Sequence, residues 1–116
     1  IASLQRAIRL NPLDPRVFMT RSAMGFAHFI AGRDSEAAEW AAMALSVKPN
    51  WPPALRVALM ANAARGELQE AERLRAVYAG LDPAMCIPKI RACYPLQREA
   101  DRQRLVEALR RAGVPE

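Results

Sequence analysis

A spacing of 34 residues relates two parts of this 116-residue chain. Five pairs of positions keep the spacing: Gly32 and Gly66, Glu36 and Glu70, Ala37 and Ala71, Trp40 and Leu74, and Pro49 and Pro83. A fixed period in this range is typical of stacked helical repeats, whose units bury their apolar faces against their neighbours. The period therefore predicts an all-α fold that presents a surface for binding.

The residues around this spacing resemble the tetratricopeptide repeat (TPR) family, in which each unit is a pair of antiparallel helices. The match over residues 18–51 is carried by Met24, Gly25, Ala27, His28, Ala31, Gly32, Ala37, Trp40, Ala44 and Pro49. Residues 52–85 match less closely, because Ala58, Leu59 and Asn62 replace the usual large apolar, small and aromatic residues, and Tyr78 replaces a usual Ala. The resemblance implies antiparallel helix pairs stacked as a short right-handed superhelix with a C-terminal capping helix.

We expect a single domain over residues 1–116, because 52% apolar residues in a chain of this length suffice for one continuous core. Residues 1–12 resemble the second helix of a truncated repeat, residues 17–49 and 52–83 resemble two repeats, and residues 84–116 resemble a degenerate repeat with the capping helix. Helical spacing and the Gly and Pro stops predict helices over residues 17–31, 36–47, 52–65, 67–79, 85–92 and 98–112.

Particular residues are expected to shape these helices. Asp34 or Ser35 is predicted to cap the helix that follows Gly32. The small residues Gly25, Ala27, Ala37, Ala44 and Ala71 are predicted at close helix contacts, where larger side chains would overpack the interface. The last helix carries an apolar stripe of Leu105, Val106, Leu109 and Ala112. Three roles stay open for it: capping the stack, folding back into the concave groove, or docking on another protein.

Nearly the whole chain looks like the C-terminal repeat region of certain bacterial signalling proteins. In that group the repeats follow an adenylate or guanylate cyclase domain, or a winged-helix DNA-binding domain. The chain has no initiator Met, and an unpaired first helix would expose Ile1, Leu4 and Ile8. We therefore expect these residues to be the tail of a larger protein.

In TPR stacks the first helix of each unit lines the concave face. Carried over by register, the resemblance implies eight partner-binding groove residues, with Ala64 beside them: Met19, Ser22, Phe26, Phe29, Ile30, Arg56, Met60 and Ala63. Phe26, Phe29 and Ile30 are not needed by the apolar stripe within their own repeat, so either a partner or the chain's own terminal segment is expected to cover them. The Lys-Asn-Asn-Lys-Arg set with which some family members grip a C-terminal peptide is absent, because Ser22 and Phe26 occupy its first two places. The apolar groove favours a helical or apolar segment of a protein partner.

No motif for catalysis is present in the sequence. It has no Gly-rich phosphate loop, no carboxylate pair in a suitable context and no identifiable Cys/His arrangement. We expect no enzymatic activity, no cofactor, no metal and no small-molecule substrate. His28 stands at the family's aromatic position, which predicts a packed, hydrogen-bonded ring.

The cysteines and the hydropathy pattern indicate a location. Cys86 and Cys93 lie seven residues apart, roughly 10 Å along a helix and therefore too far for a disulfide. Their spacing also differs from that of zinc-ligand pairs. Reduced thiols indicate the cytoplasm. No apolar stretch approaches the roughly 20 residues needed to span a bilayer, so we expect no membrane association.

The net charge of +5 would permit a polyanionic partner. The densest basic set is Arg98, Arg102, Arg104, Arg110 and Arg111, which is interleaved with Glu99, Asp101 and Glu107 and lacks aromatic residues for base stacking. Nucleic-acid contact through the last helix is therefore a minor hypothesis. The two main hypotheses are a scaffold for a protein partner and a self-association module, since a two-fold dimer uses one patch twice.

Overall fold

The computed structural model describes the backbone of residues 16–116 and the side chains of residues 19–116. Over this range it contains helices and no strand: α2 (Arg16–Ile30), α3 (Asp34–Val47), α4 (Pro52–Ala64), α5 (Leu68–Leu81), α6 (Ile87–Arg91) and α7 (Glu99–Arg111). The predicted all-α class is confirmed, and the helix ends lie within two residues of their expected positions. The predicted helix at residues 1–12 lies outside the described residues.

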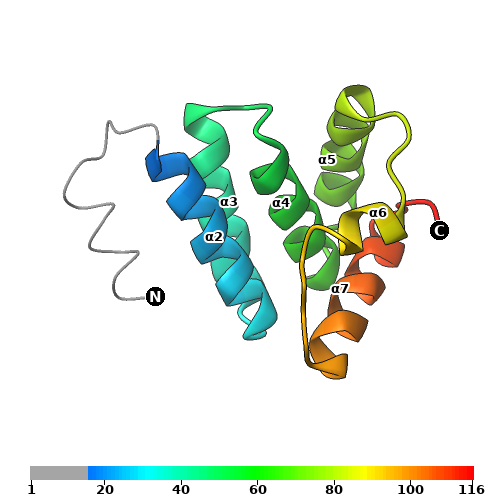
Figure 1. Ribbon diagram of the computed structural model, residues 1–116. Coiled ribbons are helices and arrows are strands. Elements are labelled where there is room, and N and C mark those ends of the chain that lie inside the picture. Colours follow the sequence, from blue (N-terminus) through cyan, green and yellow to red (C-terminus); the bar gives the residue numbers. More distant parts are fainter. Residues whose placement is uncertain (1–15) are drawn as a thin grey trace.

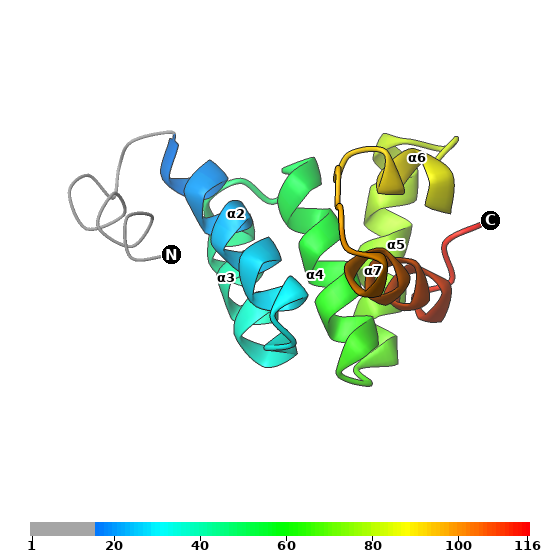
Figure 2. The same cartoon turned by 60° about the horizontal axis from the view of Figure 1, so that its bottom comes forward.

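Helices α2 to α5 lie side by side, and consecutive helices run in opposite directions (Figure 1). Each packs on the next, and α2 also contacts α4, so the first helices of the two expected repeats share a surface. We call this surface the α2–α4 face. Short helix α6 leads through residues 92–98 to α7, which packs along α4 and touches α2. In Figure 2, α7 lies in front of α4 and α5.

Helices α2 and α4 end in the same way, one period apart. Gly32 and Gly66 both have φ +86°, a conformation that only glycine adopts without steric cost. The Arg33 amide donates to the His28 carbonyl oxygen at 2.8 Å, and the Glu67 amide donates to the Asn62 carbonyl oxygen at 2.8 Å. This closure satisfies carbonyl groups left over at a helix end. The Gly32 and Gly66 pair of the 34-residue spacing therefore marks the same kind of helix end in α2 and α4.

The start of α3 differs from the prediction. The helix begins at Asp34, its N-cap position is Arg33, and no side chain caps it. Neither Asp34 nor Ser35 acts as the cap, and that prediction is wrong. The Asp34 carboxylate accepts a hydrogen bond from Arg104 of α7 instead. Asp34 therefore forms a long-range ion pair with Arg104 and makes no local capping hydrogen bond.

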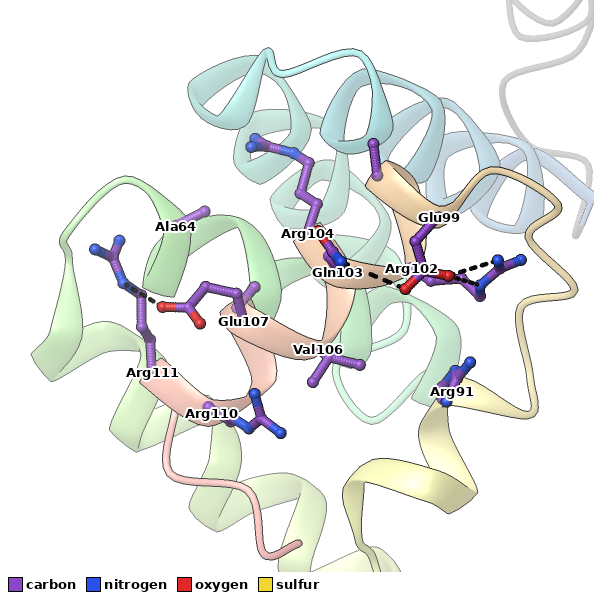
Figure 3. A pocket seen from close by; sticks show the side chains of 12 residues that line it. Ala64, Arg91, Glu99, Arg102, Gln103, Arg104, Val106, Glu107, Arg110 and Arg111 are labelled. Atoms are coloured by element: carbon purple, nitrogen blue, oxygen red, sulfur yellow. Dashed lines mark hydrogen bonds and ion pairs between the residues drawn. The ribbon is translucent and has the colours of Figure 1, made fainter.

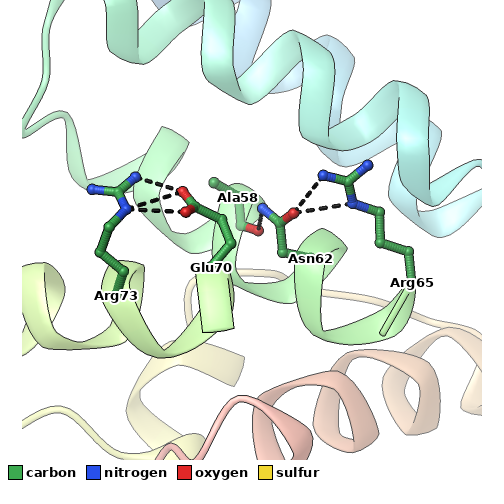
Figure 4. A network of polar contacts seen from close by, with 5 residues as sticks. All are labelled: Ala58, Asn62, Arg65, Glu70 and Arg73. Carbon is green, nitrogen blue, oxygen red and sulfur yellow. Dashed lines mark hydrogen bonds and ion pairs between the residues drawn. The ribbon is translucent and has the colours of Figure 1, made fainter. Parts of the chain in front are cut away.

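Helix α4 is the most buried element, although its sequence fits the repeat pattern poorly. Nine of its residues are buried: Ala54, Leu55, Val57, Ala58, Leu59, Met60, Ala61, Asn62 and Ala63. The Asn62 side chain donates to the Ala58 carbonyl oxygen at 2.8 Å and accepts from Arg65 at 2.7 Å, so its buried amide is satisfied (Figure 4). The same view shows Glu70 of α5 paired with Arg73.

Small residues allow α2, α3 and α4 to approach closely, as the sequence predicts. A Cβ atom added to Gly25 would lie 3.0 Å from Val57 Cγ1 and 3.2 Å from the Ala37 carbonyl oxygen. Ala37, Ala44 and Ala71 are buried at the neighbouring contacts, whereas the fifth predicted residue, Ala27, is only partly buried. The helix spacing therefore depends on the absence of a side chain at Gly25.

Candidate partner-binding surface

The eight predicted groove residues all lie on α2 and α4, but most are covered. Ser22, Phe29, Met60 and Ala63 are buried, Phe26, Ile30 and Arg56 are partly buried, and Met19 is 52% exposed. Most of the predicted groove residues are therefore not exposed in the folded chain. Residues of the chain's own C-terminal segment lie over much of the α2–α4 face, because α7 packs along α4 and against α2.

Two residues of this C-terminal segment cover the rings of Phe26 and Phe29 in α2. The Tyr94 ring stacks on the Phe26 ring, with centroids 4.2 Å apart and planes 15° apart. The Arg104 guanidinium lies 5.0 Å from the centroid of the Phe29 ring, and Arg104 Nε donates to the Phe29 carbonyl oxygen at 2.8 Å. Arg104 also pairs with Asp34. The sequence left open whether a partner or the chain's own terminal segment covers Phe26 and Phe29. In the structure the chain's own segment covers them.

One part of the α2–α4 face stays open, beside Phe26. It is an apolar hollow of about 280 Å³, lined by Met19, Ser22, Ala23, Phe26, Trp51, Pro53, Arg56, Val57 and Tyr94. Typical small-molecule sites have volumes of roughly 300–1,000 Å³ and enclose most of the ligand. A hollow of this size and apolar lining suits a protruding apolar side chain of another protein.

Arg56 forms the polar margin of this hollow. Its Nε donates to Tyr94 Oη at 3.0 Å, and its Nη1 donates to Tyr78 Oη at 3.2 Å. The guanidinium also lies 5.6 Å from the centroid of the Tyr94 ring. Burial raises the pKa of Tyr94, and the charge of Arg56 partly offsets that rise. The cluster joins α4, α5 and the segment after α6, and thereby holds Tyr94 against Phe26.

A second, larger depression of about 760 Å³ runs along α7, is also lined by Ala64 of α4 and Arg91 of α6, and has mainly charged lining residues (Figure 3). Three of its five arginines have local carboxylate partners: Arg102 lies 2.6 Å from Glu99, Arg110 lies 2.9 Å from Glu116, and Arg111 lies 3.7 Å from Glu107. The hydrogen bond from Arg102 lowers the pKa of Glu99. Carboxylates therefore balance much of the positive charge on this side.

His28 is packed and hydrogen-bonded, as predicted. It is buried, its ring stacks on Trp40 with centroids 6.3 Å apart, and its Nδ1 accepts a hydrogen bond from Arg33 Nε at 2.8 Å. Glu36 lies 3.5 Å from the same nitrogen. The ring therefore has a structural role between α2 and α3.

Other features of the described residues bear on chemistry. Cys86 and Cys93 are free thiols. Within residues 19–116, no group of three or more His, Cys, Asp or Glu side chains is arranged to hold a metal ion. None of the helices described has both the length and the apolar character to cross a membrane.

The sequence analysis did not identify Trp51 and Tyr94 as residues that line the hollow, nor Arg104 as a residue that contacts α2 and α3. Tyr94 is an isolated aromatic residue directly before Pro95 in the connection between two predicted helices, which is a detectable signal. Arg104 stands next to Leu105 and four residues before Ala108, so helical spacing places it at the edge of the apolar stripe. No spacing rule identifies its partner Asp34.

The chain matches no family model, no curated protein and no solved structure.

Proposed function

We propose that this chain is a non-catalytic, cytoplasmic protein-binding scaffold of the tetratricopeptide type. In this proposal α2–α3 and α4–α5 are two units of a short right-handed superhelix. The 34-residue spacing, the matching glycine stops of α2 and α4, and the close contact at Gly25 support it. The resemblance to bacterial signalling proteins supports a regulatory role beside a cyclase or winged-helix domain.

The observation that carries the proposal is the open apolar hollow beside Phe26. Met19, 52% exposed, lies at its edge, and the rings of Phe26, Trp51 and Tyr94 line it. Apolar surface gathered in one place marks an interaction site more often than scattered apolar residues do. Full burial of a partner's Leu or Met side chain there would contribute about 1.5–3 kcal/mol to binding.

A photo-crosslinking experiment tests the proposal. A photoreactive phenylalanine analogue replaces Ala23, which is exposed and lines the hollow, and in a matched control it replaces Ala42, which is exposed on α3. We expect one discrete protein adduct from position 23 and none from position 42. The captured protein, once purified, should bind the Met19→Asp chain about tenfold more weakly than the wild-type chain. Equal binding of both chains, or no adduct from position 23, would contradict the proposal.

Self-association is the second candidate function. Five large apolar side chains are exposed among the described residues: Met19, Met43, Val47, Leu68 and Leu81. A two-fold dimer could bury such residues in pairs. The nucleic-acid hypothesis has less support, because Arg102, Arg104 and Arg111 are paired with carboxylates.

A further inference from the structure

We infer that α7 is a tethered ligand of the α2–α4 face, and that a partner helix of the same chemistry displaces it. The inference rests on the proposed function and extends it from the open hollow to the covered part of the same α2–α4 face, by naming the helix that binds there. That partner is an amphipathic helix with an arginine directly before the first of two leucines spaced four residues apart.

The apolar stripe of α7 binds as a peptide helix would. Leu105, Ala108, Leu109 and Ala112 are at most 3% exposed. Their spacing of i, i+3, i+4 and i+7 is the one with which amphipathic helices occupy grooves. The stripe packs along α4, while the opposite side of α7 carries ion pairs within the C-terminal segment (Figure 3). Helix α7 therefore contacts the α2–α4 face through this stripe and through Arg104, and it also contacts α6.

Arg104 sets the direction and register of this helix. Its Nε donates to the Phe29 carbonyl oxygen in the last turn of α2, where the Gly32 amide is the other donor to that oxygen and the helix end favours a cation. Its guanidinium also pairs with Asp34 at the start of α3. In the ion pair, the Arg104 and Asp34 side chains are only 32% and 20% exposed. A helix shifted by one residue would lose both contacts, so the site requires arginine at this place.

The connection to α7 permits exchange without unfolding of α2 to α5. Residues 92–98 contain no helix, and most of them are exposed. Tyr94 holds the near end of this connection against Phe26 and Arg56, so α7 stays nearby when it leaves its face. A short tether gives an effective concentration on the order of 1 mM. A free helix at micromolar concentration therefore competes poorly until the hold of α7 is weakened.

The probe is a labelled peptide of residues 99–112, titrated into the full 116-residue chain while fluorescence anisotropy is measured. The Arg104→Glu chain should bind the peptide about tenfold or more tightly than the wild-type chain, because its own α7 is repelled by Asp34. The matched control is Arg111→Glu, which alters an arginine on the outer side of α7 paired only with Glu107. Its affinity should equal that of the wild-type chain. Equal affinity of the Arg104→Glu and Arg111→Glu chains would overturn the inference.

A charge reversal tests the register independently. The Asp34→Arg chain should bind a peptide with glutamate in place of Arg104 about tenfold or more tightly than the unchanged peptide. The chain with both Asp34→Arg and Arg104→Glu restores the pair and should bind either peptide as weakly as the wild-type chain. No preference of the Asp34→Arg chain between the two peptides would overturn the inference.

Amide hydrogen exchange of the wild-type chain tests the inference without any variant. The amides of α7 should exchange at least about tenfold faster than those of α4, because α7 opens separately. Equal opening free energies for both helices would overturn the inference. The proposed function is tested at Ala23 and Met19, away from Arg104 and Asp34. The two proposals can therefore fail separately.

Discussion

At the scale of single residues, Tyr94 joins three parts of the chain. Its ring stacks on Phe26 of α2, and its hydroxyl oxygen accepts a hydrogen bond from Arg56 of α4. Burial raises the pKa of its phenol group in the folded chain above the unfolded value of about 10. As the pH rises through that unfolded value, the unfolded chain loses this proton first. The stabilisation from the neutral phenol is complete below about pH 10 and is lost above it.

We therefore predict that the free energy of unfolding falls more steeply between about pH 9 and about pH 11 in the wild-type chain than in Tyr94→Phe. Phenylalanine keeps the ring on Phe26 but has no ionisable group. At neutral pH the variant should be less stable by about 1 kcal/mol, because the hydrogen bond from Arg56 is lost. Urea unfolding followed by circular dichroism measures both effects. Parallel pH profiles for the two chains would show that Tyr94 does not contribute to the alkaline loss of stability.

At the scale of helices, packing depends on close approach as much as on apolar surface. Gly25 of α2 faces Val57 of α4 and the backbone of α3, at distances that leave little room for a side chain. In α5, by contrast, an added Cβ at Gly80 would meet nothing within 4 Å. The two glycines therefore have opposite expected responses to enlargement, although both lie inside helices.

We predict that Gly25→Val lowers the free energy of unfolding by about 1–3 kcal/mol, because the added methyl groups force α2, α3 and α4 apart. Gly80→Ala is the matched control and should raise it by about 0.4–1 kcal/mol, since alanine restricts the unfolded chain without a clash. Thermal unfolding of both variants gives the comparison. A Gly25→Val chain as stable as the wild type would mean that the helices move apart at little cost.

At the scale of the whole molecule, the C-terminal segment decides how much apolar surface the chain exposes. With α7 in place, Phe29, Met60 and Ala63 are fully buried. The radius of gyration is 13.3 Å, close to the value of about 13 Å expected for a compact chain of this length. A chain that covers its own α2–α4 face has less apolar surface with which to associate with copies of itself.

We predict that the wild-type chain scatters light as a monomer of 12.9 kDa, independently of concentration. Leu105→Asp should give a larger, concentration-dependent mass, because a buried charge on α7 uncovers the apolar face. Ala100→Asp, at an exposed position of the same helix, should remain monomeric. A wild-type mass that rises with concentration would instead favour the self-association hypothesis.

The helices could be predicted from sequence because their signals are local. At Gly32 and Gly66, where α2 and α4 end, the glycine amide and the next amide bond to carbonyl oxygens three and five positions earlier. The groove residues were assigned to the correct helices for the same reason. Their burial could not be predicted, since exposure of Phe29 depends on Arg104, 75 residues later. The burial of α4 exceeds what its weak repeat match predicts, because the Asn62 amide is satisfied by Ala58 of the helix and by Arg65 at its C-cap.

The sequence by itself determined that this chain is helical, where its helices stop, and which small residues allow them to pack, because these properties depend on neighbours along the chain. Only the tertiary structure decided where α7 goes. The stripe of Leu105, Leu109 and Ala112 is equally compatible with capping the helix stack, filling a groove or binding a partner, since the hydrophobic effect is not directional. The choice came from oriented contacts between distant residues, the pair of Arg104 with Asp34 and the stacking of Tyr94 on Phe26.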